Sequence, residues 1–378
     1  MRLKLGEFKG RRRAALRWLG GPLMVLTGLV LLLLSHRQPG FAAWYAERIF
    51  PVFPHIAGRF WGLFPFSVFE ILIIALALCL PIGLALIIVN LCGSRGRTRL
   101  KAFAKTAPLR LLYALSIIFL VFVLTAGINY SRESYADHIG IAVQDSSLEE
   151  LVSLYLMLVA RAELLAGQID TDADGYFVLR REGLYNYARQ SMHSLNSKYG
   201  GLGTFFPRAK APLLSRFVLS NSNIGGFFSP WTMEAHYNAD MPDQSIPFVI
   251  NHELAHVAGH MREDEANFIA YLASRNSEHV DFQYSAVYVA LSYTLNALRR
   301  NVPPEQYNEL FDMLPQQLRC DFAAAHAYWQ AFQGRAADLA TRTNDAYLRL
   351  NQQQDGVLSY GRMVDLLLAY YRAYLYIT

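Results

Sequence analysis

Residues 252–273 read HELAHVAGHMREDEANFIAYLA, and this stretch predicts two consecutive helices joined by a tight turn. Glycine adopts the left-handed conformation that ends helices at little cost, so the first helix is expected to stop at Gly259. A second helix then starts near Arg262 and continues through the EDEAN run. We therefore expect an antiparallel helical hairpin in which the start of the second helix faces the last turn of the first.

This hairpin contains a candidate metal site. His252 and His256 lie on one face of a helix, where both imidazoles can reach one ion, and Glu253 lies beside them in the position of a base that activates a bound water. Glu263 is expected to face His256 and to supply the third ligand, which leaves a fourth position for water. Glu265 is the competing third ligand, because the sequence does not fix the phase of the second helix. The predicted cofactor is Zn²⁺.

A second interaction is expected to orient one of these ligands. Asn267 lies one helical turn after Glu263, so its side chain should approach His252 and hydrogen-bond it. The alternative is a buried polar helix pair without a metal. Its carboxylates and imidazoles would then need other partners, because unpaired buried charge is costly.

The HELAH and EDEAN runs resemble the HExxH and Glu-x-x-x-Asp/Asn motifs of the gluzincin zinc metallopeptidases. The resemblance implies that His252, His256 and Glu263 are the ligands and that Glu253 is the base. Two features depart from the gluzincin pattern. Asn267 stands where many gluzincins have aspartate, and only six residues separate His256 from Glu263.

The whole chain resembles the uncharacterised bacterial membrane family called domain of unknown function 3810. That resemblance depends on three apolar runs before the hairpin, on GFFSPWTMEAHYN at 226–238 and on SYGRMVDLLLAYY at 359–371. It implies no activity.

The three apolar runs, about 18–35, 71–92 and 111–128, carry no charged residue. About 20 helical residues cross a hydrocarbon core of ~30 Å, and an isolated strand would leave its backbone groups unpaired in lipid. We therefore predict a membrane domain over residues 1–130 with three transmembrane helices. Residues 131–378 should form a second, zinc metallopeptidase-like domain.

The composition agrees with a membrane protein. Apolar residues make up 53% of the 378 residues and charged residues only 17%, whereas soluble domains contain about 25% charged residues. The net charge of +5 comes from basic residues that flank the apolar runs rather than forming one face, so no nucleic-acid partner is expected. Only Cys320 lies after the runs, which excludes a disulfide framework there.

The placement of arginine and lysine predicts the orientation. These residues are frequent before the first run and between the second and third runs: Arg2, Lys4, Lys9, Arg11, Arg12, Arg13, Arg17, Arg95, Arg97, Arg99, Lys101, Lys105 and Arg110. The positive-inside rule predicts a multi-pass protein of the cytoplasmic (inner) membrane of a bacterium, with a cytoplasmic N-terminus and an extracytoplasmic C-terminal domain. The aromatic loop between the first two runs should lie either on the outer leaflet or against that domain.

The predicted fold class is mainly α (α+β), with a mostly helical zincin-like domain and a small β ribbon after the membrane helices. Residues 147–166 are typical of an amphipathic helix capped by Ser146 or Ser147. Residues 184–199 should form another helix, and the turn-flanked, aromatic-rich residues 223–239 predict the ribbon. This ribbon precedes the motif as the substrate-pairing edge strand does in gluzincins, with an ordinary core strand as the alternative.

The predicted function is a zinc-dependent endopeptidase that is anchored in the lipid bilayer and acts on a protein or peptide substrate at the outer face of the cytoplasmic membrane. Glu253 is expected to transfer the protons. The alternative is a catalytically inactive receptor or scaffold with the same fold. Hydrolysis also needs a donor for the oxyanion opposite the metal. The candidates are His236, Tyr237, Tyr284, Tyr288 and Tyr360. The sequence does not indicate an oligomeric state.

Overall fold

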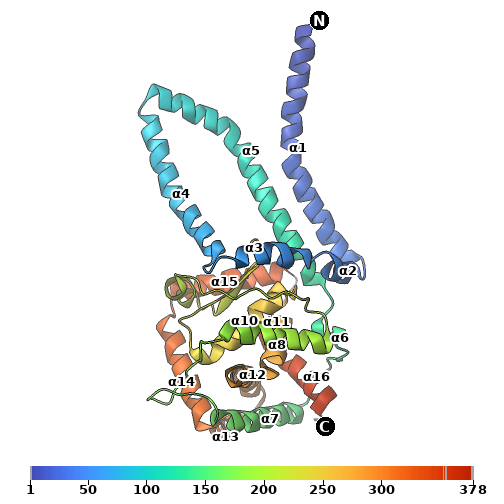
Figure 1. Ribbon diagram of the computed structural model, residues 1–378, viewed down its shortest axis with the longest axis vertical. Coiled ribbons are helices and arrows are strands. Elements are labelled where there is room, and N and C mark those ends of the chain that lie inside the picture. Colours follow the sequence, from blue (N-terminus) through green and yellow to red (C-terminus); the bar gives the residue numbers. More distant parts are fainter. Residues whose placement is uncertain (1, 352, 354–355, 376–378) are drawn as a thin grey trace.

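Three long helices extend from the same side of a helical body in this computed structural model (Figure 1). They are α1 (Arg2–Arg37), α4 (Val68–Leu91) and α5 (Ser94–Thr125). Each contains a segment that is long and apolar enough to cross a membrane, within Trp18–Arg37, Val68–Leu91 and Ser94–Ser131. These segments contain the three predicted runs almost entirely. Helix α5 begins earlier than predicted, because the basic segment after α4 continues the helix instead of forming a loop.

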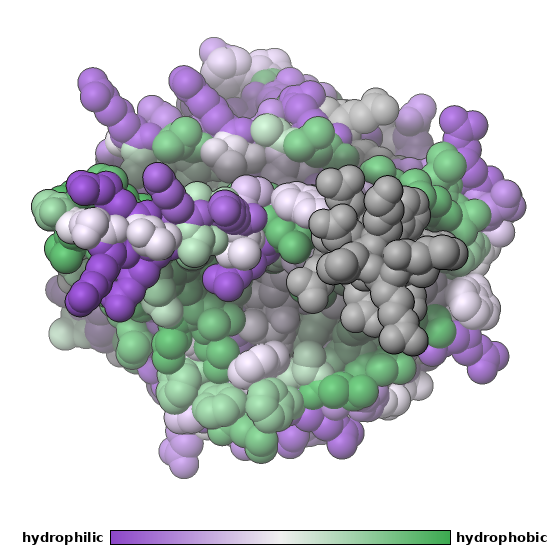
Figure 2. Space-filling model, turned by 90° about the horizontal axis from the view of Figure 1, so that it is seen from above, coloured by the Kyte–Doolittle hydropathy of each residue, from purple (hydrophilic) through white to green (hydrophobic). Residues whose placement is uncertain are grey.

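The structure describes the backbone of residues 2–351, 353 and 356–375, and the side chains of 2–17, 215, 216, 359, 360 and 375 lie outside the described part. The basic residues predicted to orient the N-terminal tail therefore fall outside it. The other basic cluster lies in the first half of α5: Arg95, Arg97, Arg99, Lys101 and Lys105. Figure 2, which views the molecule from this end, shows hydrophilic side chains gathered over the turn between α4 and α5. This turn and the helical body lie at opposite ends of α4.

Helix α1 packs closely against α5 because glycines line the contact. A Cβ atom on Gly20 would lie 2.2 Å from the Tyr113 hydroxyl, and one on Gly28 would lie 2.6 Å from the Phe119 ring. Small residues allow membrane helices to approach each other in this way. Helix α4 has little such contact, and none of its most apolar window is buried. Its surface is therefore available to lipid along most of its length.

Part of the aromatic loop between α1 and α4 packs against the body, as in the second of the two predicted positions, while Trp44 and Phe60 stay exposed. It forms α2 (Phe41–Arg48), the π-helix η1 (Pro54–Gly58) and α3 (Arg59–Gly62). Tyr45 and Phe50 are buried in one apolar cluster with Met261, next to the second helix of the hairpin. The loop thus joins the base of the membrane helices to the body.

The body is mostly helical, as predicted. Its helices are α6 (Tyr135–His138), α7 (Leu148–Ala166), α8 (Leu184–Tyr199), α9 (Ser215–Val218), α10 (Ile246–Val257), α11 (Glu263–Arg275), α12 (Val280–Asn301), α13 (Pro304–Asp312), α14 (Gln316–Ala331), α15 (Arg335–Leu350) and α16 (Met363–Leu375). Short 3-10 helices are η2 (Gly127–Ser131), η3 (Ser220–Ser222), η4 (Asp243–Ser245) and η5 (Gly356–Arg362). Helix α12 packs against α7, α10 and α11 and so runs through the centre of the main apolar core.

The predicted helix cap at residues 146–147 is confirmed at Ser147. The Ser147 hydroxyl accepts a hydrogen bond from the backbone N–H of Glu150 at 3.2 Å, and the Glu150 carboxylate accepts one from the N–H of Ser147 at 2.8 Å. This reciprocal pair satisfies two N–H groups that a helix start leaves without intrahelical partners. Helix α7 therefore begins where the sequence predicts.

The predicted ribbon consists of two antiparallel strands, β1 (Gly226–Ser229) and β2 (Glu234–Tyr237), with Phe227 opposite His236. The outer edge of β2 is paired by Lys210, which forms a parallel bridge with His236. Among the described residues, no strand or bridge pairs with the outer edge of β1. Both strands lie next to α10, and Gly226 at the start of β1 lies against Glu253.

Candidate metal centre

The two ligand-bearing helices form the predicted hairpin. Helix α10 ends at Val257, and Gly259 adopts the left-handed conformation with a φ of +89°. The turn is closed by hydrogen bonds from Gly259 N to the carbonyl of His256 and from His260 N to the carbonyl of Ala255. A Cβ atom on Gly259 would also lie 2.8 Å from the Phe50 ring. Glycine is therefore required here by both its backbone conformation and its surroundings.

The hairpin brings His252, His256 and Glu263 together. The two Nε2 atoms are 3.1 Å apart, and the Glu263 Oε2 atom lies 3.1 Å from that of His252 and 3.6 Å from that of His256. Ligand atoms at ~2.05 Å from a tetrahedral zinc ion lie about 3.3 Å from each other. The triangle formed by these atoms has that size, so the residues present fit a zinc ion.

The electrostatics of the triad also suit a cation. Burial disfavours the charged form of His256, but the Glu263 carboxylate outweighs it and raises the pKa of His256 to about 9. Burial alone would raise the pKa of Glu263, yet the two histidines hold it well below its usual range. Without a metal, a proton on His256 balances the carboxylate. A divalent cation would replace that proton, as expected for a site whose ligands must be deprotonated.

Neighbouring groups orient both histidine rings. The Nδ1 atom of His256 lies 2.7 Å from the carbonyl oxygen of His260, so Nδ1 carries the hydrogen and Nε2 is left for a metal. Burial lowers the pKa of His252. The Asn267 side chain hydrogen-bonds His252, as predicted, and offsets a small part of this decrease. The Asn267 amide also donates to the Tyr293 hydroxyl at 3.3 Å. Such contacts fix ring orientation in metal sites.

Glu253 lies beside the triad with a buried carboxylate. Its Oε2 atom has no hydrogen-bond partner among the described residues. Burial raises the pKa of Glu253 to about 8, with His256 opposing this rise and Glu263 adding to it. A Cβ atom on Gly226 would come within 2.7 Å of the other carboxylate oxygen. The glycine at the start of β1 thus allows the strand to approach the carboxylate of Glu253.

The second acidic residue of helix α11 has a different role. The Oε2 atom of Glu265 accepts a hydrogen bond from the backbone N–H of Tyr135 at 2.5 Å, and its Oε1 atom accepts one from Arg262 at 2.9 Å. Glu265 therefore holds the start of α6. Of the two predicted third ligands, the structure brings Glu263, and not Glu265, to the histidines.

The predicted oxyanion donors do not join the triad. His236 accepts from the Ser67 hydroxyl at 2.8 Å, because successive residues of β2 face opposite sides and His236 points away from α10. Tyr284 donates to Asp321, and Tyr288 stacks on Phe322.

Tyr237 lies at the end of β2, where it packs partly buried against the main core. The side chain of Tyr360 lies outside the described part. The structure therefore places none of the four described candidates in hydrogen-bond contact with the triad.

The structure places three further residues near the triad that no sequence pattern indicates. Burial raises the pKa of Tyr293 to about 12, with a smaller contribution from Glu263, and burial together with Glu263 also raises the pKa of Tyr347. The Gln353 side chain accepts a hydrogen bond from Glu263 N at 3.0 Å. These residues come from α12, α15 and the segment after α15. Only the tertiary fold brings them together.

Comparison with known proteins identifies a family but no activity. A family model described as "Protein of unknown function (DUF3810)" matches residues 45–368. No curated protein and no solved structure matches the chain. The matched range includes two of the membrane-length helices, the ribbon, the hairpin and most of the helical body. This chain therefore belongs to the DUF3810 family of proteins of unknown function.

Proposed function

We propose that this protein is a membrane-anchored zinc-dependent endopeptidase. The observation that carries the proposal is the buried triad of His252, His256 and Glu263 with the Glu253 carboxylate beside it. Zinc bound there would supply Lewis acidity, which makes water acidic and polarises a carbonyl group. The donor set of two imidazoles and one carboxylate is typical of catalytic rather than purely structural zinc sites.

Glu253 is proposed to move the protons of the reaction. Its carboxylate accepts a proton from water as the water oxygen bonds to the peptide carbonyl carbon. It then donates that proton to the amine as the peptide C–N bond breaks. The raised pKa of Glu253 supports this role, because a group that gains and loses a proton in each cycle works best with a pKa near the ambient pH.

Strand β1 is proposed to bind the substrate backbone. Its outer edge has no partner among the described residues, and its first residue, Gly226, lies against Glu253. An extended peptide added to this edge would gain main-chain hydrogen bonds with little demand on its side chains. The scissile bond would then lie close to the carboxylate.

Tyr347 is proposed to donate to the oxyanion. Its hydroxyl accepts a hydrogen bond from Tyr130 at 2.9 Å, so its own proton is available to the substrate. The charge of Glu263 contributes to the raised pKa of Tyr347. Tyr347→Phe is expected to lower kcat/KM about a hundredfold with unchanged zinc content. Tyr288→Phe, which removes a hydroxyl elsewhere in the body, serves as the control and should retain activity. Equal activities of the two variants would contradict the role of Tyr347.

The orientation is proposed from charge. The basic residues of α5 lie at the far end of the membrane helices from the body, and positively charged loops remain in the cytoplasm. The candidate centre would then face the outside of a bacterial cytoplasmic membrane. Its substrate would be a protein or peptide on that side.

The experiment that tests this function uses the purified full chain in detergent. Hydrolysis of a denatured protein or a mixed peptide library is expected, with complete loss on adding a metal chelator and recovery on adding zinc. Recovery with zinc would link activity to the metal. Absence of hydrolysis by the zinc-loaded protein on every substrate would contradict the proposal.

A catalytically inactive receptor or scaffold is the second candidate, and one observation favours it. The side chains that would do the chemistry are nearly inaccessible, with His252 8% and Glu253 3% exposed. A substrate would have to open the site before reaction. Full zinc occupancy without turnover in the experiment above would favour this candidate over the peptidase.

A further inference from the structure

An exposed apolar segment lies at the base of the membrane helices. We call residues 213–218 the insertion loop; its described apolar side chains are exposed by 77% at Leu213, 40% at Leu214, 76% at Phe217 and 52% at Val218. Groups of exposed apolar residues mark interaction sites. We propose that the insertion loop embeds in the lipid leaflet around the base of α4.

The first reason is that the loop is attached to the start of a membrane helix. The Glu70 carboxylate accepts hydrogen bonds from the backbone N–H groups of Leu213 at 2.7 Å and Leu214 at 2.8 Å. Glu70 is in the first turn of α4, whose membrane-length segment begins at Val68. The loop therefore lies at the level where α4 would enter the membrane.

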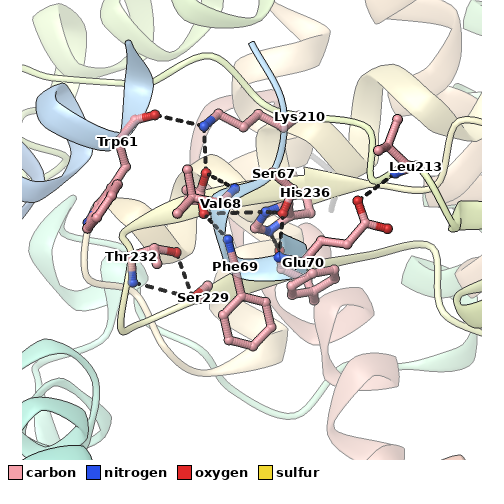
Figure 3. Close-up of polar contacts among 12 residues, drawn as sticks. Trp61, Ser67, Val68, Phe69, Glu70, Lys210, Leu213, Ser229, Thr232 and His236 are labelled. Carbon is pink, nitrogen blue, oxygen red and sulfur yellow. Dashed lines mark hydrogen bonds and ion pairs between the residues drawn. The ribbon is translucent and has the colours of Figure 1, made fainter. Parts of the chain in front are cut away.

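A buried polar cluster keeps the chain before the loop at this level (Figure 3). The Lys210 ammonium group donates to the Glu234 carboxylate at 2.5 Å and to the carbonyl oxygen of Trp61 at 2.8 Å. The same carboxylate accepts from the backbone N–H groups of Val68 at 3.0 Å and Phe69 at 2.9 Å. The start of α4, strand β2 and the residues before the loop are thereby held together as one unit.

The neighbouring residues are also those expected at a lipid surface. Trp231, in the turn of the ribbon, stacks on Phe69 of α4, and its Nε1 atom donates to the carbonyl oxygen of Ile118 in α5 at 3.2 Å. It is 41% exposed. Tryptophan prefers the headgroup layer because its ring is apolar and its N–H group is polar.

The segment just before α4 adds apolar side chains at the same level. Phe60 is 54% exposed and Leu63 is 77% exposed. Both precede Ser67, which caps α4 by accepting a hydrogen bond from Glu70 N. The apolar surface thus surrounds the start of α4 from two distant parts of the sequence and is continuous with that helix. This continuity favours lipid over a protein partner.

The test places a fluorophore on the loop in the full chain. Cys79, Cys92 and Cys320 are replaced by alanine, and a single cysteine is introduced by Phe217→Cys and labelled with the polarity-sensitive dye NBD. Leu164→Cys is the matched control, because Leu164 is 63% exposed and lies on α7, on the side of the body opposite the membrane helices (Figure 1). Both proteins are reconstituted in phosphatidylcholine vesicles, with and without doxyl-labelled phosphatidylcholine.

The dye at position 217 is expected to show blue-shifted emission and to lose fluorescence with the doxyl lipid, whereas the dye at position 164 should show neither. Adding Glu70→Ala should reduce quenching at position 217, because the loop loses its attachment to α4. Emission at position 217 equal to that of the control would overturn the proposal. A blue shift without lipid quenching would also overturn it, because a second protein surface would then cover the loop.

Discussion

Glu253→Gln is expected to lower the rate of peptide hydrolysis by about 10²-fold to 10⁴-fold, which is the usual contribution of a general acid–base group. Glutamine has nearly the shape of glutamate but cannot accept a proton from water. The triad of His252, His256 and Glu263 is untouched, so the zinc content should be unchanged. Hydrolysis of a fluorogenic peptide and metal analysis of the same preparation measure both quantities.

The substitution is also expected to leave the protein folded. Burial raises the pKa of Glu253 to about 8, so a charged carboxylate is disfavoured at this position and an uncharged amide costs little. Asp264→Asn provides the control, because Asp264 is a half-buried carboxylate on the same hairpin that accepts from the N–H of Glu265. Wild-type activity in Glu253→Gln would exclude the proposed proton transfer. Equal losses in both variants would indicate a general effect on the hairpin.

Lys210→Met is expected to lower the free energy of unfolding by about 3–5 kcal/mol. Both side chains of the Lys210–Glu234 pair are 2% exposed, and the substitution leaves the Glu234 carboxylate buried without its cation. Burial acts to raise the pKa of Glu234, but the hydrogen bonds from Lys210, Val68 and Phe69 keep it below its usual value. Loss of the lysine removes the strongest of these bonds.

Thermal unfolding of the full chain in detergent measures this effect, and a decrease in Tm of about 10 °C is expected. The double variant Lys210→Met, Glu234→Gln is the control. It removes both charges, so it should recover part of the lost stability, because removing both members of a buried pair is less costly than removing one. An unchanged Tm in Lys210→Met would show that the pair does not stabilise the base of α4.

Features with a local pattern were predicted correctly from the sequence. The end of α10 follows from Gly259, and the start of α7 follows from the Ser147 and Glu150 capping pair. The membrane-length helices follow from uninterrupted apolar runs. Each of these features depends on a continuous stretch of the sequence and not on contacts between distant segments.

The choice between Glu263 and Glu265 required the structure. Two residues differ by about 200° around a helix, so the answer depends on the residue at which α11 begins. That residue is Glu263, and its side chain points to the histidines while Glu265 points to Tyr135. The sequence contains no signal that distinguishes these phases.

The positions of the candidate oxyanion donors could not be predicted for a related reason. His236 is one of the predicted candidates, but strand alternation directs its side chain to Ser67. Tyr347, the donor that we propose instead, belongs to α15, whose position depends on packing against η3 and η5. Contacts between segments that are distant in sequence are set by the whole fold.

The most direct test of the central claim is the zinc content of the purified full chain after incubation with zinc and removal of the excess. About one zinc ion per chain is expected for the wild type. Glu263→Ala should lose the metal, and Glu265→Ala, two residues away, should keep it. A wild-type protein that binds no zinc, or equal zinc contents in the two variants, would contradict the account.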